Sequence, residues 1–332
     1  MTSVPKVFGG KAAAKKNKTG FFRQLGKQWQ LALMSVPMLL YVFLFNYFPL
    51  WGWRNAFLDI ANERGTLIPF LSGQTPAWYG FKNFTNLFSA NAITFQETLR
   101  NTIAMSLINL VLGTVSAIIL AVLLNEVRNR KFKRTVQTVT YLPHFLSMII
   151  VVGMAKIIFD SSDITPGPIN ELLLTSGLVK KGPNWLGEEK YFWWLVGVIN
   201  VWKEVGWGTI IYISAMTGID PCLYEAASID GAGRFQRILH VTLPGIRSTF
   251  MILLIMNIGH LLDTGFEIQY LLKSSGTMHV AYTVDLYVME YGTQTLDIGL
   301  GTAAGIFKSL VAIILLTGAN FIAKRLGEDS LL

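Results

Sequence analysis

Long apolar runs alternate with short polar and charged stretches along most of the chain. Six of these runs match the roughly 20 helical residues that are needed to cross a bilayer core of about 30 Å. They cover residues 31–50, 99–124, 136–159, 192–216, 248–272 and 299–322. Because backbone groups in lipid must be hydrogen-bonded within their own segment, each run is expected to be a helix. The pattern predicts an all-α, polytopic membrane protein.

The polar stretches divide the rest of the chain. Residues 1–28 are expected to be a solvated basic tail, 29–325 the transmembrane domain, and 326–332 a short C-terminal tail. Anionic lipid headgroups are an alternative partner for the basic tail. A cleaved signal peptide is not expected, because the first apolar run is too long and no small-residue cleavage site follows it. Residues 51–98 and 160–191 are expected to form short helices and loops on the outer face.

Composition supports the membrane interpretation. Only 14% of the residues are charged, whereas soluble domains average about 25%. The net charge of +8 could indicate nucleic acid or a membrane surface, and the apolar runs favour the membrane, so no nucleic-acid partner is expected. A single cysteine, Cys222, excludes an internal disulfide framework.

Lysine and arginine predict the orientation. Those beside one set of run ends are Lys6, Lys11, Lys15, Lys16, Lys18, Arg23, Lys27, Arg128, Arg130, Lys131, Lys133, Arg134, Arg234, Arg237, Arg247, Lys324 and Arg325. Fewer lie on the opposite side, and they are spread over longer loops. Because basic residues near span ends stay in the cytoplasm, both termini and the loop 219–245 are predicted to be cytoplasmic.

Residues 225–244 read EAASIDGAGRFQRILHVTLP, a polar stretch between two apolar runs. Asp220 can cap a helix that begins with Pro221, because proline suits a first helical turn. This helix is expected over about residues 223–230, and Gly231 can end it in the left-handed conformation. A short helix and a tight turn are therefore predicted.

A second short helix is expected after this turn. Phe235, Ile238, Leu239 and Thr242 lie at i, i+3, i+4 and i+7 and would share one mainly apolar face. Pro244 is expected to end this helix. Two interpretations remain open on the residues alone: a docking element for a protein with basic groups, and a purely structural helix at the membrane surface.

The stretch resembles the EAA loop of ABC-type import permeases. The resemblance rests on Glu-Ala-Ala, a glycine after three further residues, and a later Leu-Pro, with Val241 where isoleucine is common. It implies a coupling helix that sits in a groove of a cytoplasmic ATPase subunit. The residues to which it assigns this role are Glu225, Ala226, Ala227, Asp230, Gly231, Phe235, Leu243 and Pro244.

Further stretches resemble the carbohydrate branch of these permeases. They are residues 79–88, 119–147, 201–220 and 301–320, and the resemblance covers roughly 79–325. It implies the six-helix fold of type I ABC importer permeases in a bacterial inner membrane. It also implies four kinds of partner: a second permease, two ATPase subunits that bind ATP and Mg²⁺, an extracytoplasmic solute-binding protein, and an oligosaccharide. The second permease is expected to be a homologue that forms a heterodimer with this chain, and an identical copy is the alternative. No cofactor is expected in this chain.

Polar and aromatic residues inside the apolar runs are candidates for a substrate path. Ionisable groups within a membrane usually face the bundle interior or a wet cavity, and sugars are bound by hydrogen-bonding groups together with flat aromatic rings. The candidates are Asn200, Trp202, Lys203, Glu204, Trp207, Tyr212, Asn257, His260, Asp263 and Lys308. Structural ion pairs are the alternative for the charged members. The spacing of His260, Asp263 and Glu267 predicts one shared helix face.

Catalytic chemistry is not indicated. The sequence has no phosphate-binding loop of the GxxxxGK[ST] kind, no spacing typical of metal ligands, and no nucleophile–base arrangement, so no catalytic or metal-binding residue is predicted. A transport subunit that works by alternating access is the leading hypothesis. The alternatives are an ABC permease for a non-sugar solute and an ion-coupled secondary transporter that uses Lys203, Glu204, His260 and Asp263.

Overall fold

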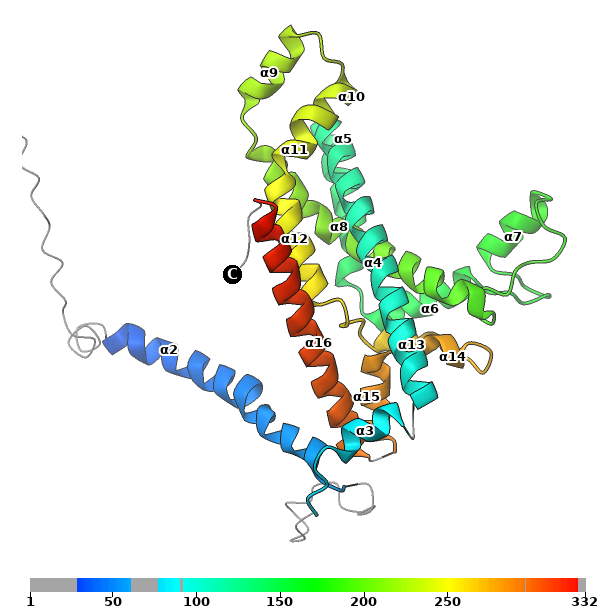
Figure 1. The fold of residues 1–332 in the computed structure, drawn as a ribbon. Coiled ribbons are helices and arrows are strands. Elements are labelled where there is room, and N and C mark those ends of the chain that lie inside the picture. Colours follow the sequence, from blue (N-terminus) through cyan, green and yellow to red (C-terminus); the bar gives the residue numbers. More distant parts are fainter. Residues whose placement is uncertain (1–28, 61–76, 90–91, 296, 328–332) are drawn as a thin grey trace, which may run out of the picture. The chain divides into compact units, whose positions relative to one another are not determined.

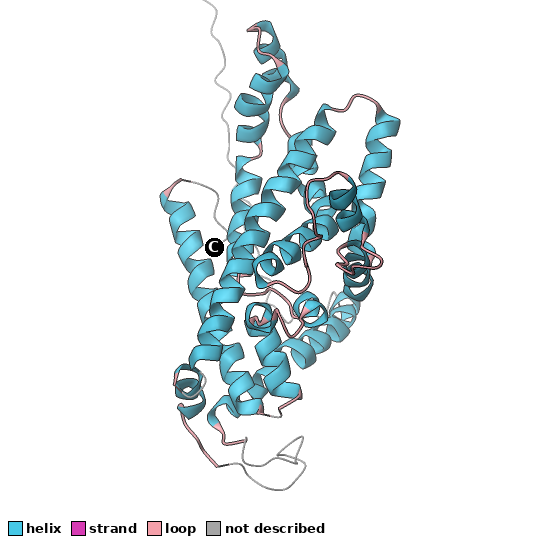
Figure 2. Cartoon of the chain, turned by 90° about the vertical axis from the view of Figure 1, so that its right-hand side faces the viewer, coloured by secondary structure: helices cyan, strands magenta, loops and turns pink. Residues whose placement is uncertain are grey.

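The computed structural model describes residues 29–60, 77–89, 92–295 and 297–327. The chain divides into two compact units, one ending at Gly52 and the other beginning at Trp53, and each is considered by itself. Within the described ranges every regular element is a helix (Figure 2). The sole β-type pairing among these residues is an isolated bridge between Leu58 and Trp78. The predicted all-α class is confirmed. The basic tail 1–28 lies outside the described residues, as do most of the residues assigned to the C-terminal tail.

The first unit contains the first apolar run. Its helix α2 spans Trp29–Val42, and the chain continues through a π-helical turn, η1, at Phe43–Tyr47. A 3₁₀ helix, η2 (Phe48–Phe57), begins in this unit and ends in the second. Together they form a helical stretch, Leu33–Phe57, that is long and apolar enough to cross a membrane.

The second unit is a bundle of long and short helices (Figure 1). Its elements are α3 (Lys82–Phe88), α4 (Ala92–Glu126), α5 (Arg130–Tyr141), η3 (Leu142–Phe145), α6 (Met148–Ile158), α7 (Pro168–Thr175), α8 (Glu189–Thr217), α9 (Pro221–Ile229), α10 (Arg234–Arg237), η4 (Ile238–Thr242), α11 (Leu243–Gly245), α12 (Arg247–Gly259), α13 (Glu267–Leu272), α14 (Met278–Ala281), α15 (Val284–Thr293) and α16 (Ile298–Arg325).

Two packing relationships organise this bundle. Helix α4 runs against α8, and α16 packs against both α12 and α15. The α9–α10 segment and the junction of α4 with α5 lie at one end, whereas α3 and α15 lie at the other (Figure 1). The basic residues that follow α4 therefore share an end with the polar loop, as the charge pattern predicts.

The helices that correspond to the apolar runs differ in length, hydropathy and straightness. Among the described residues, three helical stretches are long and apolar enough to cross a membrane by themselves, and two bent pairs raise this number to five if each pair counts as one span. Helix α8 has 29 residues but is not among them. The mean hydropathy of α8 is lowered by Lys203, Glu204 and several tryptophans. The number of six spans stays a prediction.

The run over residues 136–159 does not form one helix. The stretch Arg130–Phe145 meets α6 at an angle of 106°. Leu146 and Ser147 adopt extended backbone conformations between the two parts, directly after the 3₁₀ turn that contains Pro143. Apolar composition predicted a continuous helix here, but the backbone leaves the helical conformation at these two residues.

The expected helix over residues 248–272 is also wrong as a single element. Helix α12 ends at Gly259, and α13 begins only at Glu267. Between them the Asp263 N–H donates to the His260 carbonyl at 2.8 Å, and Gly265 takes a positive φ of 68°. Because this turn separates the helices, His260, Asp263 and Glu267 do not share one helix face.

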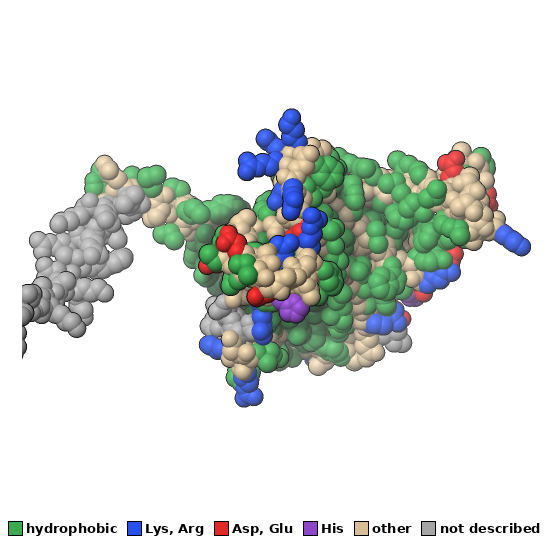
Figure 3. Space-filling view, turned by 90° about the horizontal axis from the view of Figure 1, so that it is seen from above, with side chains coloured by type: hydrophobic (Ala, Val, Ile, Leu, Met, Phe, Trp, Pro, Cys, Tyr) green, Lys and Arg blue, Asp and Glu red, His purple; other side chains and the backbone are tan. Residues whose placement is uncertain are grey.

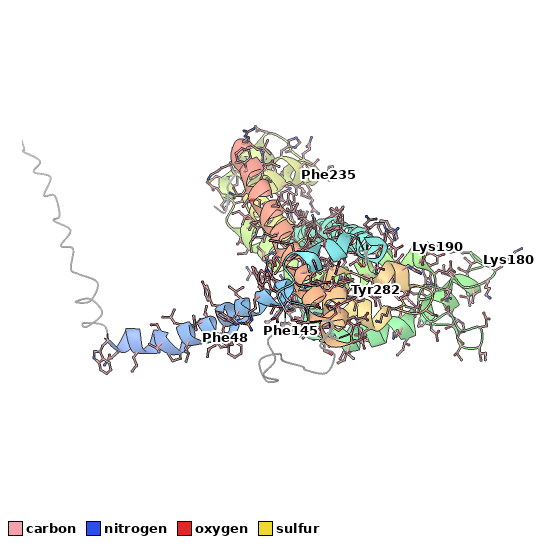
Figure 4. The ribbon with its side chains drawn as sticks, turned by 60° about the horizontal axis from the view of Figure 1, so that its bottom comes forward. Phe48, Phe145, Lys180, Lys190, Phe235 and Tyr282 are labelled. Atoms are coloured by element: carbon pink, nitrogen blue, oxygen red, sulfur yellow. The ribbon has the colours of Figure 1, made fainter. Side chains whose placement is uncertain are left out.

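The segments predicted to lie outside the membrane contain short helices. In the segment around α7, Asn170 is buried, and its side-chain amide donates to the carbonyls of Asp160 and Pro183 at 2.9 and 3.2 Å. Figure 4 shows Lys180, which follows α7, and Lys190, in the first turn of α8, away from Phe235 of the polar loop. A hydrogen bond from Lys190 holds the pKa of the exposed Glu188 carboxyl below its usual value.

A buried polar cluster fastens the region between α13 and α15. Glu290 of α15 accepts hydrogen bonds from Lys273 and from the Tyr282 hydroxyl. Burial raises the pKa of the Tyr282 phenol above its usual range, and the bond to Glu290 acts in the same direction. The phenol therefore stays protonated and keeps its role as donor at neutral pH.

Candidate functional site

The first half of the polar loop has the predicted geometry. The Asp220 carboxylate accepts a hydrogen bond from the Cys222 N–H at 2.9 Å and caps α9, and Pro221 occupies the first turn. Gly231 has a φ of 81° and ends the helix in the left-handed region. Both signals are local in sequence, which is why the pattern alone was sufficient to predict them.

The second half is longer than predicted. Helix α10 passes into the π turn η4 and then into α11, so that Pro244 lies inside a helical stretch that continues to Gly245. The expected end at Pro244 is therefore wrong, and the bend of 58° comes just before Arg247, where α12 begins. A hydrogen bond of 3.0 Å joins the Tyr224 and Thr242 hydroxyl groups and holds the two halves together.

The loop presents apolar and acidic groups to its surroundings. The side chains of Ile229 and Phe235 are 86% and 72% exposed, although both are large and hydrophobic. Glu225, Ala226 and Asp230 are also exposed. Lysine and arginine side chains project from the same end of the molecule (Figure 3). Exposed apolar side chains beside charged ones are typical of a surface on which another protein docks.

The residues assigned to coupling gather around this surface. Ala227, Asp230 and Gly231 line a hollow of about 250 Å³ on the loop. Leu243 is half-buried against a core cluster at the C-terminal end of α8 that includes Met216 and Ile246, whereas Pro244 is exposed. The loop is thus joined to the bundle through Leu243 and free at its tip.

A second feature is a cavity of about 500 Å³ between α4, α8, α12 and the turn after α12. It is lined by seven of the predicted path residues: Asn200, Glu204, Trp207, Tyr212, Asn257, His260 and Asp263. Trp202, Lys203 and Lys308 are not in its lining. Trp202 borders a smaller apolar cavity with α6 instead. The structure brings most of the predicted residues together, although His260 and Asp263 reach the cavity from a turn.

Lys203 and Glu204 form an ion pair that also involves the break in the third run. The Lys203 ammonium donates to Glu204 Oε1 and to the His144 carbonyl, both at 2.9 Å. The other carboxylate oxygen of Glu204 lies 2.7 Å from His144 Nδ1. Lys203 is only 8% exposed and lies behind the cavity wall. His144 was missed in the sequence, where only its position beside Pro143 could have drawn attention.

Lys308 pairs with two carboxylates. Its ammonium lies 2.5 Å from Asp263 and also contacts Asp285, which was not predicted. The second oxygen of Asp285 accepts the Gly265 N–H at 2.9 Å. This arrangement fixes the turn after α12 against α15 and α16. Of the two interpretations for charged residues, pairing holds for Lys203 and Lys308, while Glu204 and Asp263 both pair and line the cavity.

Two polar residues of α4 also line the cavity and were missed. Ser106 Oγ and Asn109 Oδ1 are buried and have no hydrogen-bond partner among the described residues. A spacing of three places them on one helix face, and this is the signal that the sequence offered. Unpaired buried polar atoms are costly, and both belong to residues of the cavity wall, so a ligand or water that reached them would relieve this cost.

In the part of the chain that the structure describes, no group of three or more His, Cys, Asp or Glu side chains could hold a metal ion. The cavity offers hydrogen-bond acceptors, amides and an indole. These are groups that bind and orient a polar solute.

The chain matches one family model over most of its length. The model described as "Binding-protein-dependent transport system inner membrane component" covers residues 110–328. Protein LplB of Bacillus subtilis (strain 168) is 38% identical over 331 residues, which is 100% of both chains. The polygalacturonan/rhamnogalacturonan transport system permease protein YteP of the same organism is 40% identical over 317 residues, 96% of this chain and 94% of that protein.

A solved structure has the same fold. It is described as a bacterial ABC transporter involved in the import of the acidic polysaccharide alginate. The similarity has a TM-score of 0.80 and 32% identity, and it covers 92% of this chain and 98% of the solved chain. A second structure, of the alginate transporter with an alginate pentasaccharide-bound periplasmic protein, also has a TM-score of 0.80, with 31% identity.

Proposed function

Because this chain belongs to the family of binding-protein-dependent transport system inner membrane components, we propose that it is a transmembrane subunit of an ABC importer that takes up oligosaccharides. One observation carries the proposal. A single chain combines an exposed helical loop at one end of the bundle with a cavity deeper inside, in whose wall amides, carboxylates and an indole lie among apolar side chains. The loop suits a motor protein, and the cavity suits a hydroxylated solute.

The loop is the docking site for an ATPase subunit. Ile229 and Phe235 supply apolar area, and Glu225 and Asp230 supply charges for a basic rim on the partner. The pairing of Tyr224 with Thr242 makes the loop a stiff unit, and Leu243 joins it to the core at α8. Movement of the ATPase can therefore reach α8, which forms one wall of the cavity.

The cavity is part of the substrate path. Asn200 and Asn257 can both donate and accept hydrogen bonds, and Trp207 offers a flat face to the C–H groups of a sugar ring. About 500 Å³ falls within the range of small-molecule sites in proteins. The path works by alternating access, in which closure of the ATPases moves the loops and reorients the bundle.

The complete importer needs further chains. A second permease supplies the other half of the path, two cytoplasmic ATPases bind ATP and Mg²⁺, and an extracytoplasmic binding protein delivers the sugar. The subunit lies in a bacterial cell membrane, surrounded by lipid. Both termini and the α9–α10 loop face the cytoplasm, in agreement with basic residues at that end of the bundle.

The test is a charge reversal on the loop. Glu225→Lys in the assembled importer is expected to abolish ATP-dependent sugar uptake into proteoliposomes and to release the ATPases during purification, while the permease still inserts. Glu171→Lys on α7, at another exposed position, is the matched control and should leave both readouts unchanged. Normal uptake and normal ATPase retention with Glu225→Lys would refute the docking role. Uptake that continues without any ATPase would refute the ABC mechanism itself.

A further inference from the structure

We propose that the cavity wall supplied by this chain binds an uncharged sugar unit through its hydroxyl groups and disfavours sugar carboxylates, an inference that rests on the proposed function. Two independent features carry it: the signs of the charges in the wall, and the unpaired polar atoms on α4.

Among the described residues, the cavity wall contains carboxylates but no positively charged side chain. Among the described residues that line the cavity there is no lysine or arginine, and the two charged members are Glu204 and Asp263. Their partners Lys203 and Lys308 lie outside the lining. A solute in the cavity therefore meets carboxylate oxygens, which accept hydrogen bonds and donate none.

The charges around Asp263 do not cancel. Lys308 carries one positive charge and pairs with both Asp263 and Asp285, so that the group holds one excess negative charge. Lys203 balances Glu204 one to one. A uronate brought into this wall would meet like charge in a partly desolvated site, where electrostatic repulsion is stronger than in water. A neutral sugar would instead donate its hydroxyls to the same oxygens.

The polar atoms of α4 indicate where further hydroxyls bind. Ser106 is only 6% exposed, and its Oγ has no partner among the described residues. Asn109 Oδ1, one helical turn further, is likewise unpaired and accepts hydrogen bonds. A hydroxyl group can donate to one and accept from the other, which a carboxylate cannot do.

The remaining groups of the wall agree with this assignment. One face of the Trp207 indole is covered by the His144 ring, with 4.6 Å between the ring centroids, so its other face and its edges are left for a sugar ring. His260 donates its Nδ1–H to the Met256 carbonyl at 2.9 Å, which makes Nε2 of the neutral ring an acceptor.

A preference for uncharged sugars distinguishes this chain from some of its relatives. The names of YteP and of the solved importer refer to polygalacturonan and to the acidic polysaccharide alginate. The wall described above has no cation with which to bind a uronate, so overall similarity to these proteins does not transfer acidic substrates to this half of the path.

A competition experiment tests the proposal directly. The assembled importer with its binding protein is reconstituted in proteoliposomes at pH 8, where an ordinary histidine is neutral. It is given an equimolar mixture of neutral oligosaccharides from galactan and xyloglucan with oligogalacturonates and alginate oligosaccharides. Mass spectrometry of the lumen is expected to show ATP-dependent accumulation of neutral oligosaccharides at least tenfold above that of uronate oligomers. Equal or greater accumulation of uronate oligomers would overturn the inference but leave the proposed function standing. Failure of every sugar to accumulate would overturn both.

Variants locate the effect in the wall. Ser106→Ala and Asn109→Ala are each expected to lower uptake of the accumulated sugar at limiting concentration by about fivefold, the size of one lost hydrogen bond. Ser116→Ala is the control, because Ser116 lies on the same helix but outside the lining and donates to the Gly113 carbonyl. Asp263→Asn is expected to raise the uronate share of the accumulated sugar. An unchanged rate in both α4 variants would exclude them as ligands of the sugar.

Discussion

The imidazole ring of His144 lies flat on the indole of Trp207, with ring centroids 4.6 Å apart and planes 7° from parallel. His144 belongs to η3, the turn at which the third apolar run breaks, and Trp207 belongs to α8. The same imidazole bonds to Glu204, which in turn holds Lys203. The break is therefore a fixed structure fastened to the wall of the cavity.

This contact predicts a graded loss of stability. His144→Phe keeps an aromatic ring over Trp207 but removes the hydrogen bond to Glu204, and it is expected to cost about 1–2 kcal/mol. His144→Ala loses both and should cost more. Thermal unfolding in detergent measures the difference. His279→Phe is the control, since the His279 side chain is 74% exposed and lies 3.6 Å from Glu97. Equal Tm values for the two His144 variants would mean that the ring stacking contributes nothing.

Lys308 holds two carboxylates close together, and its removal is expected to destabilise the protein. Lys308→Met leaves Asp263 and Asp285 without their cation. Because the Asp263 side chain is 50% exposed and the other two groups are only partly buried, the cost is expected to be below the value of about 3–5 kcal/mol that is typical of a fully buried pair. The yield of monodisperse protein and its Tm should both fall.

A second substitution separates charge from packing at this site. Asp285→Asn, added to Lys308→Met, should recover part of the loss because one unpaired charge disappears. Lys324→Met, at an exposed position near the end of the same helix, should be silent. A double variant no more stable than Lys308→Met would show that the lost charge balance is not the cause.

Gly206 allows α8 to approach the end of α5. A Cβ at this position would lie 2.1 Å from the Thr140 carbonyl oxygen, a backbone atom that cannot move aside alone. Gly206→Ala is expected to prevent the two helices from packing and to cause aggregation during size-exclusion chromatography. Gly153→Ala on α6 meets no atom within 4 Å and should be tolerated or slightly stabilising, because alanine favours helix over glycine by about 1 kcal/mol. Normal elution of Gly206→Ala would contradict this packing.

The turn of the polar loop requires a left-handed backbone conformation at Gly231. Its φ of 81° is left-handed, and open space surrounds the position, so that backbone strain alone limits substitution. Gly231→Val should abolish ATP-dependent uptake because it distorts the loop. Gly231→Asn should retain most uptake, since asparagine tolerates this region. The nearby Gly233→Ala should be harmless, because Gly233 has a φ of −67°. Full uptake with Gly231→Val would show that the turn is not needed for coupling.

Much of this protein could be predicted from local sequence. The long apolar runs predicted helices because lipid leaves a backbone few alternatives, and 299–322 lies wholly within α16. Asp220 and Gly231 predicted the start and the end of α9, since capping and left-handed turns depend on a few neighbouring residues.

The partners of the polar groups required the tertiary structure. His144 and Glu204 are 60 positions apart in the sequence, and Lys308 reaches Asp285 from another helix. The spacing of residues along the sequence does not predict such pairings, because they depend on which helix faces pack together. The break after Pro143 and the early end of α12 could not be predicted for a related reason. Apolar composition indicates that a segment can lie in a membrane. Where its helix bends or ends depends on the neighbouring elements that contact its backbone and side chains. The sequence by itself determined the helices and the loop, and packing between distant helices decided which polar groups face the cavity.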